Sequence, residues 1–448
     1  MKRTIPILIC LCLLLGACGQ AVPAEPSPTS APTPAPTPEP TPEPTPEPTP
    51  EPTPEPVGQK LDITVKAKRG NASPLTDGLY TTDVQFAPDM LLTITAEEPI
   101  GSLYIIFSTY PGEYKLTAGG VEQTCGKNNF LHEYIELEVP SSTVEITLAH
   151  SYIAVAEISA YTVGRPPEEV QVWEPADQPA DILIFSTHSD DELLFMGGMI
   201  PYYAAVRGLR VQLVYMTTNY QPMSRSTHTL HYRHRPHETL NGLWRCGVRI
   251  YPVTNMVPDR LCNTILDAQR NYGQHRFAEF QTEMIRRFKP LVVVTQAENG
   301  EYGHGAHILT VLSVKRAVVA AADPEQFPAS AEIYGVWDTP KTYLHLYGDD
   351  DTITILNYEE PSEALGGLTP FETAKEAYKL HITQQQWKDF FVYDYGHIFD
   401  CHRYGLFRSL VGADVERNDL MEHVSREDFP VPELREDAAP APDDTGEP

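Results

Sequence analysis

A regular pattern of apolar and polar positions first appears between about Leu61 and Gly164, where short β-rich runs are separated by turn residues. Apolar residues alternate with polar ones, as at Leu92 and Ile94, and no long helical period interrupts the runs. A period of two is typical of strands with one buried face, and many short strands favour a β-sandwich. The predicted strands are Leu91–Ala96, Ser102–Ser108, Tyr134–Val139, Thr143–Ala149 and Ile153–Tyr161.

After Pro179 the pattern changes to buried strands that alternate with helices. We predict strands at Ile182–Thr187, Arg210–Thr217, Ile250–Val253 and Leu291–Thr295. The predicted helices are Leu193–Arg207, Pro236–Cys246, Phe277–Phe288 and His307–Ala321. This order predicts an α/β fold, with a Rossmann-like parallel sheet covered by helices on both sides. Ligands of such sheets bind beyond the carboxyl ends of the strands.

The amino terminus has the features of a bacterial lipoprotein export signal. Lys2 and Arg3 precede an apolar stretch, Ile5–Leu15, that is too short to span a bilayer and is followed by two small residues and Cys18. We expect residues 1–17 to be removed and Cys18 to carry a lipid, which would anchor the protein to the outer face of a bacterial cell membrane. The alternative is an ordinary cleaved signal followed by a chance cysteine.

From Ala31 to Val57 the chain is almost entirely a Thr-Pro-Ala-Pro and Thr-Pro-Glu-Pro repeat, with nothing apolar to bury. Alternate prolines favour extended polyproline II, so the repeat should reach roughly 80 Å at about 3.1 Å per residue and hold the folded part away from the membrane. We therefore expect residues 18–58 to form a disordered spacer. The formal net charge of −28 argues against nucleic acid as a partner, because the Lys and Arg clusters that bind it are absent.

Two folded domains are expected after the spacer, a β-sandwich over 59–165 and an α/β domain over 178–430, with a disordered acidic tail at 431–448. Between Glu332 and Val424 no motif can be assigned, and His381 is interpreted there as structural. The cysteines of the exported part are widely spread and form no C-x-x-C pair, which argues against a cysteine zinc site or a dense disulfide framework. One bridge, between Cys246 and Cys262, is left open; the four residues are Cys125, Cys246, Cys262 and Cys401.

Two short motifs carry the candidate chemistry. His188 and Asp191 follow the first α/β strand and are three residues apart, so a helical turn there would project both to one side. His304 and His307 repeat this spacing after the strand at Leu291–Thr295. Two imidazoles and a carboxylate suit a catalytic zinc ion, since three protein ligands leave one position for water.

Asp190 is not one of these metal ligands and is the candidate general base. An uncoordinated carboxylate beside the metal-bound water can accept a proton from it. The competing interpretation is purely structural: Asp190, Asp191 and Glu192 are favourable acids at a helix N-terminus. The histidines would then be ordinary loop residues.

From Asp181 to about Ala321 the sequence resembles the PIG-L or LmbE-like deacetylases, whose hallmarks are His-Pro-Asp-Asp-Glu after the first strand and a distal His-x-x-His. The resemblance implies His188, Asp191 and His307 as metal ligands and Asp190 as the base. It further implies that His304 stabilises the oxyanion and helps to protonate the leaving amine, that Tyr302 polarises the acetyl carbonyl, and that Arg235 and Glu238 lie near the substrate. For this last pair, an ordinary ion pair along one helix is an equal alternative. The sequence departs from the family pattern at Ser189, Gly305 and Ala306, where Pro, Pro and Asp are common.

The start of the β-region also resembles the discoidin-like, galactose-binding jelly-roll domains. The resemblance rests on Leu75, Thr76, Asp77, Gly78, Thr81 and Thr82. Tyr110 and Phe130 are loop aromatics that could stack on a sugar ring.

Together these features predict a zinc-dependent hydrolase, with Fe²⁺ as an alternative ion, that removes acetyl groups from N-acetylglucosamine-type sugars at the cell surface. Its expected partners are an N-acetylated glycan and, through the lipid, a membrane. One rival is a surface glycan-binding lipoprotein without activity. Another is an iron oxygenase whose facial triad would be His188, Asp190 and His307.

Overall fold

The computed structural model describes residues 55–148, 153–218, 230–349 and 351–432. These residues belong to one compact unit that begins at Glu55. The predicted export signal, Cys18, nearly all of the proline-rich repeat and the end of the acidic tail lie outside the described residues. Within the described ranges, no helix combines the length and the apolarity needed to cross a membrane.

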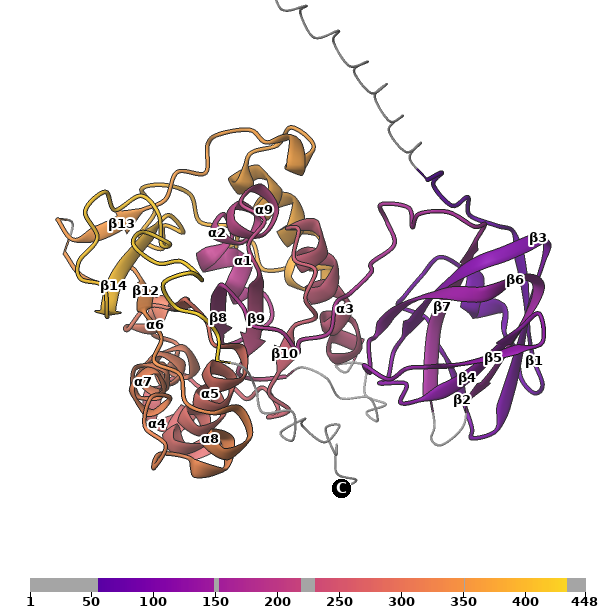
Figure 1. Ribbon diagram of the computed structural model, residues 1–448, viewed down its shortest axis with the longest axis horizontal. Helices are drawn as coiled ribbons and strands as arrows, with labels where there is room; N and C mark the ends of the chain where they lie inside the picture. Colours follow the sequence, from indigo (N-terminus) through magenta and orange to yellow (C-terminus); the bar gives the residue numbers. More distant parts are fainter. Residues whose placement is uncertain (1–54, 149–152, 219–229, 350, 433–448) are drawn as a thin grey trace, which may run out of the picture. The chain divides into compact units, whose positions relative to one another are not determined.

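The region before residue 165 is rich in antiparallel strands (Figure 1). Two strands, β3 (Met90–Phe107) and β6 (His132–Leu148), each span two predicted strands. At the predicted break in β3 the pairing with β6 shifts register between Thr95 and Ile100 and again before Ser102. Such a bulge bends a strand without ending it. The other elements are β1 (Ile63–Ala67), a 3₁₀ helix (Ser73–Thr76), β2 (Val84–Phe86), β4 (Tyr114–Ala118), β5 (Val121–Cys125) and β7 (Ile153–Tyr161).

Hydrogen bonds connect these strands in the order β2-β7-β3-β6-β4-β5, with β1 paired to β3. Four strands, β1, β2, β4 and β5, were not predicted, because each is five residues or shorter and has at most three buried positions. The prediction of a sheet-rich region is confirmed. Its assignment to the jelly-roll class stays a prediction.

The second sheet has the order β10-β9-β8-β11-β12-β14-β13, and its strands from β10 to β12 are parallel. Beyond β12 the sheet turns antiparallel, with β14 paired to β12 and β13 to β14. The predicted parallel sheet is therefore present from β10 to β12, but the whole sheet is mixed, because its last strands lie in the region without motifs and apolar runs do not report strand direction. The strands are β8 (Ile182–Ser186), β9 (Val211–Tyr215), β10 (Val253–Thr254), β11 (Val292–Thr295), β12 (Lys341–His345), β13 (Ile353–Ile355) and β14 (Arg403–Ser409).

Helices cover both faces of this sheet, as predicted (Figure 1). Successive residues of a strand face opposite sides. Ile182 and Ile184 of β8 belong to a core cluster with α1 and α3, whereas Leu183 and Phe185 belong to one with α5 and α7. The helices are α1 (Asp191–Met196), α2 (Met199–Pro201), α3 (Leu230–Arg245), α4 (Ile265–Asn271), α5 (Gln274–Phe288), α6 (Gly300–Gly303), α7 (Gly305–Ala320), α8 (Pro328–Tyr334) and α9 (Pro370–Lys379).

The helix predicted at Leu193–Arg207 is interrupted. After α1 and α2 a π-helical turn covers Tyr202–Val206. Pro201 at this junction has no N–H to donate, which removes one bond of the regular α-helical ladder.

The arrangement of β8 and β11 positions the two motifs. These strands pair in parallel register from Ile182 with Val292 to Phe185 with Thr295, so their carboxyl ends lie at the same edge of the sheet. The chain leaves β8 toward β9 on one side and returns with β11 on the other. This is a topological switch point, the usual place for a ligand site in an open α/β sheet.

The four described cysteines are buried and free, so a Cys246–Cys262 bridge is not formed. Cys246 packs in the core cluster of α1 and α3, and Cys262 in that of α5 and α7. The two thiols are thus held in different cores.

Candidate active site

Three donor atoms from the two motifs converge at this switch point. His188 Nδ1 lies 2.9 Å from Asp191 Oδ2, and His307 Nε2 lies 3.2 Å from His188 Nδ1 and 3.1 Å from Asp191 Oδ2. His188 comes from the end of β8, Asp191 from the first turn of α1 and His307 from the first turn of α7. The three side chains are at most 11% exposed.

This triangle fits a single metal ion. A tetrahedral zinc ion with bonds of about 2.0–2.1 Å holds its donors roughly 3.3 Å apart, so the side chains would need to move by only a few tenths of an ångström. His304 also offers a nitrogen within 4.8 Å of His188 and His307 donor atoms, and its buried Nδ1 has no hydrogen-bond partner among the described residues. The donor set therefore suits a divalent transition metal.

Each imidazole of the triangle also has a carboxylate near its other nitrogen. His307 Nδ1 lies 2.8 Å from Glu301 Oε2, and His188 Nε2 lies 3.4 Å from Asp259 Oδ1. Carboxylates in these positions fix the orientation of a metal-binding imidazole and increase its basicity. Neither Glu301 nor Asp259 was predicted, because neither lies in a motif and both reach the site only through the fold.

Glu301 is held in a demanding conformation. Its φ of +54° lies in the left-handed region that non-glycine residues rarely adopt. Its side chain is completely buried and also bonds the backbone N–H of Ala297 at 2.8 Å and lies 3.2 Å from Nδ1 of His345 on β12. Backbone strain of this kind persists only where the surroundings impose it, and it is enriched at functional sites.

The departures at 305 and 306 have a structural explanation. The N–H of Gly305 donates to the carbonyl of Cys262 at 3.0 Å, a bond that proline could not make. A Cβ atom on Gly305 would come within 2.0 Å of the Thr264 carbonyl oxygen. Ala306 is fully buried in an apolar core, and the carboxylate beside His307 comes from Glu301. Nothing in the structure explains why Ser189 replaces proline.

Asp190 is not part of the triangle. Its Oδ1 forms an ion pair with Arg235 Nη2 at 3.0 Å, and the same guanidinium donates to the Ser189 carbonyl at 2.7 Å. Asp190 therefore lies beside the three donors with its carboxylate held by Arg235. The carboxylate within the triangle belongs to Asp191, which disfavours a facial triad built on Asp190.

Charge in the site favours a cation. Burial alone would raise the pKa of Asp191, but His307 and His188 hold it well below its ordinary value. Burial would lower the pKa of His307, yet Asp191 and Glu301 raise it to about 9. The carboxylates thus stabilise positive charge at the point where the three donors meet.

The remaining predicted residues differ in placement. His304 and Tyr302 lie beside His307, with ring centroids 4.6 and 5.5 Å from it, and Tyr302 is 48% exposed. Glu238 is buried and accepts hydrogen bonds from the N–H and the hydroxyl of Thr383 at 2.9 and 2.6 Å. Glu238 therefore ties α3 to the turn at Ile382–Gln384, and its predicted contact with substrate stays a prediction.

The predicted structural residue His381 is fully buried, with its Nε2 3.8 Å from Glu192 Oε1. Burial lowers the pKa of His381 to about 3. The imidazole is therefore neutral, as suits a core position.

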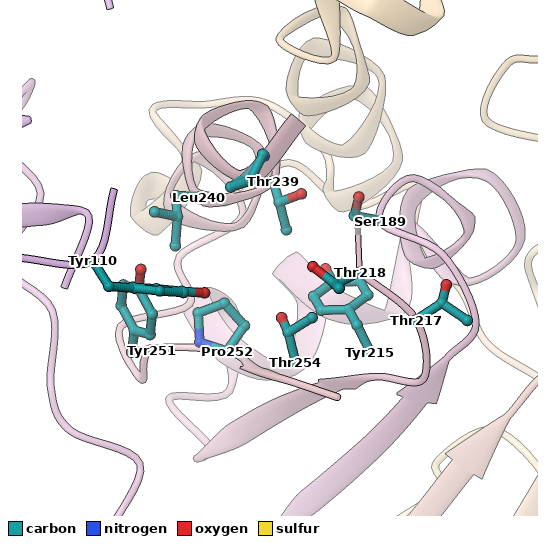
Figure 2. Close-up of a pocket in the computed structure, with 11 residues that line it drawn as sticks. Tyr110, Ser189, Tyr215, Thr217, Thr218, Thr239, Leu240, Tyr251, Pro252 and Thr254 are labelled. Atoms are coloured by element: carbon teal, nitrogen blue, oxygen red, sulfur yellow. The ribbon is translucent and has the colours of Figure 1, made fainter. Parts of the chain in front are cut away.

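A pocket is lined in part by Ser189, the residue that follows His188 of the triangle (Figure 2). Tyr110 lies near Tyr251 at one end of it. Phe130 stacks on Tyr251 with centroids 4.5 Å apart and is only 8% exposed, so its predicted role as an exposed sugar platform was wrong. Aromatic faces and hydroxyls together suit a polar ligand with apolar patches, such as a sugar. The hydroxyl groups come from Ser189, Thr217, Thr218, Thr239 and Thr254, in addition to the tyrosines.

Comparison with known proteins identifies the class of this region. Residues 183–321 match the family model PIG-L, described as GlcNAc-PI de-N-acetylase. This part of the chain is therefore similar to the PIG-L family, in agreement with the resemblance drawn from the two motifs.

Two curated relatives are similar over this part of the chain. The 1D-myo-inositol 2-acetamido-2-deoxy-alpha-D-glucopyranoside deacetylase 1 of Catenulispora acidiphila is 28% identical over 203 residues, which are 42% of this chain and 61% of the relative. The 1D-myo-inositol 2-acetamido-2-deoxy-alpha-D-glucopyranoside deacetylase of Geodermatophilus obscurus is 45% identical over 60 residues, or 13% of this chain and 19% of the relative. The chain thus spans less than two thirds of either relative.

Among solved structures, N,N'-diacetylchitobiose deacetylase from Pyrococcus horikoshii matches with a TM-score of 0.35 and 17% identity. The match covers 48% of this chain and 74% of that one.

Proposed function

We propose that this protein is a metal-dependent hydrolase that removes the acetyl group from N-acetylglucosamine-type sugars. The observation that carries the proposal is the triangle of His188 Nδ1, Asp191 Oδ2 and His307 Nε2 beside Asp190, within the part of the chain that is similar to the PIG-L family. The names of the curated relatives, which are deacetylases of an N-acetylated glucosamine compound, support the substrate class.

In this proposal His188, Asp191 and His307 would hold the ion, for which zinc is the first candidate and Fe²⁺ the alternative. When bound, such an ion polarises a carbonyl and makes water more acidic. Asp190 accepts the proton of the attacking water as the amide is hydrolysed to acetate and a free amine. Arg235 keeps that carboxylate in place through the ion pair.

Two further residues would act on the amide. His304, beside His307, stabilises the developing oxyanion and delivers a proton to the leaving nitrogen. Tyr302, exposed at the same edge, donates to the acetyl carbonyl. The pocket of Figure 2 would hold neighbouring parts of the glycan against Tyr110 and Tyr251.

The test is acetate release from N-acetylglucosamine and its short oligomers, measured on metal-depleted protein after addition of zinc or iron. We expect release that depends on the ion, and a fall in kcat of about 10²–10⁴-fold for Asp190→Asn with unchanged metal content. Absence of release with every ion, together with glycan binding that Asp190→Asn leaves intact, would favour the glycan-binding alternative and overturn the proposal.

We also propose that the protein is exported and lipid-anchored through Cys18, on the strength of the amino-terminal sequence alone. Labelling of cells with a radioactive fatty acid should mark the wild-type protein and not Cys18→Ala. Equal labelling of both proteins, or of neither, would contradict the anchor.

A further inference from the structure

A second group of possible metal ligands lies in the carboxy-terminal region that carries no motif. Glu359, Asp394 and His402 each offer one donor atom, and these atoms all lie within 4.8 Å of one another. Glu359 and His402 also line a cavity of about 320 Å³ together with Tyr395. None of these residues belongs to the active site described above.

His402 is the residue that points to a ligand. It is 2% exposed, and its Nδ1 lies 2.7 Å from Asp400 Oδ1, which also accepts the His402 backbone N–H at 2.9 Å. His402 Nδ1–H therefore donates to Asp400, which leaves Nε2 as the acceptor. That Nε2 is buried and has no hydrogen-bond partner among the described residues.

An unsatisfied buried acceptor costs about 1–3 kcal/mol, so native proteins rarely leave one without a partner. The pairing of one imidazole nitrogen with a carboxylate is also the arrangement found around metal-bound histidines, here made by Asp400. The other two members of the cluster are exposed carboxylates, Glu359, which also lines the cavity, and Asp394. Asp394 Oδ1 accepts the N–H of Tyr395 at 2.6 Å, and rotation of the exposed Glu359 side chain can close the remaining separation.

We propose that Glu359, Asp394 and His402 form a second site for a divalent transition metal, with zinc as the preferred ion. Calcium and magnesium take oxygen ligands almost exclusively, whereas one imidazole with two carboxylates suits zinc. The site is separate from the proposed deacetylase chemistry and does not depend on it.

The role of such an ion would be structural, because its ligands bracket one segment. Asp394 and His402 stand at the two ends of residues 394–402, which include Phe399, a neighbour of Phe195 in α1 at 6.0 Å between centroids. Within the same segment the Asp400 carbonyl lies 2.9 Å from Nε2 of His345, whose other nitrogen reaches Glu301. An ion bound by Asp394 and His402 would thus hold residues 394–402, which contact His345 and through it Glu301.

The experiment uses the full chain in a His307→Ala background, which removes one ligand of the active site; Asp191→Asn is the second background if the first fails to fold. Zinc alone is titrated against a chromogenic chelator, and bound zinc per chain is measured after gel filtration. We expect one zinc ion in this background. Adding Glu359→Gln and Asp394→Asn should weaken the binding of this zinc ion by at least about 100-fold. That loss is larger than the loss expected when only an outer partner of a metal ligand is removed.

The matched control is Glu360→Gln with Asp389→Asn, which removes two exposed carboxylates of the same region and the same charge. It should bind zinc as the background does. As a second readout, zinc should slow hydrogen exchange of residues 394–402 in the background and not in the Glu359→Gln, Asp394→Asn protein. No bound zinc in the background, or equal binding by the neutralised and control proteins, would mean adventitious binding only and would overturn the proposal.

Discussion

The triangle at the switch point and the cluster at the carboxy-terminal cavity both contain a histidine whose second nitrogen meets a carboxylate, yet they differ in rigidity. In the triangle the donors are at most 11% exposed, and Glu301 and Asp259 hold the two imidazoles. In the cluster at the cavity, Asp400 holds His402 and the N–H of Tyr395 donates to Asp394, but Glu359 and Asp394 are both exposed.

For the two proposed metal sites, this difference would separate a catalytic role from a structural one. A site built for a reaction needs its donors fixed before the ion arrives, because misplacement of reacting groups is costly in rate. A site that braces a loop can recruit flexible carboxylates from solvent. The variants below test whether the two sites differ in how firmly their donor atoms are held before an ion binds.

The largest effect is expected for His307→Ala, which removes one of three proposed ligands. In the proposed mechanism the ion would supply several kcal/mol of transition-state stabilisation, so acetate release should fall by about 10³-fold or more. Elemental analysis should show loss of the active-site metal, while zinc at the carboxy-terminal cluster is retained. Loss of both ions together would contradict the independence of the two sites.

Glu301→Gln should weaken metal binding or activity by about 10–100-fold, the usual cost of losing an outer partner of a metal-bound histidine. The measurement is chelator competition combined with acetate release. Glu298→Gln, at an exposed position of the same loop, is the matched control and should behave like wild type. An affinity for Glu301→Gln equal to that of the control would show that Glu301 does not position His307.

Asp259→Asn should have a smaller effect, on the order of 10-fold in the same assay. Its contact with His188 is longer, at 3.4 Å, and its side chain is 27% exposed, so solvent replaces part of the interaction. A larger loss of metal affinity or activity for Asp259→Asn than for Glu301→Gln would contradict the expectation that Glu301 matters more than Asp259 for holding its histidine.

The smallest effect on turnover is expected from partial metal removal. Limited chelation should first take the ion from the exposed carboxylates Glu359 and Asp394, lowering the thermal midpoint but leaving most of kcat. Tyr393 and Phe399 still pack on Phe195, with centroids 5.4 and 6.0 Å away, and keep the segment in place. Activity that falls in strict proportion to the first metal removed would contradict this order.

Much of the α/β architecture could be read from the sequence, because local signals and the fold agree there. The strands β8, β9 and β11 and the helices α3, α5 and α7 lie where the apolar pattern predicted them. The direction of β14 could not be predicted from the sequence, since the direction of a strand depends on which neighbouring strand it pairs with and on how the chain returns to the sheet. The bulge in β3 was missed for a related reason: a break in alternation looks the same whether the chain turns or bends.

What the sequence determined by itself is the pair of three-residue spacings, His188 to Asp191 and His304 to His307, because residues so close in the chain stay near each other where a loop enters a helix, at α1 and at α7. The tertiary structure alone decided which distant groups complete the site. Glu301, itself in the left-handed region, reaches His307, and Asp259 meets His188 from a separate loop. In the folded core, His402 Nε2 has no hydrogen-bond partner within the part of the chain that the structure describes. These contacts depend on packing between segments far apart in the chain, and no local pattern encodes them.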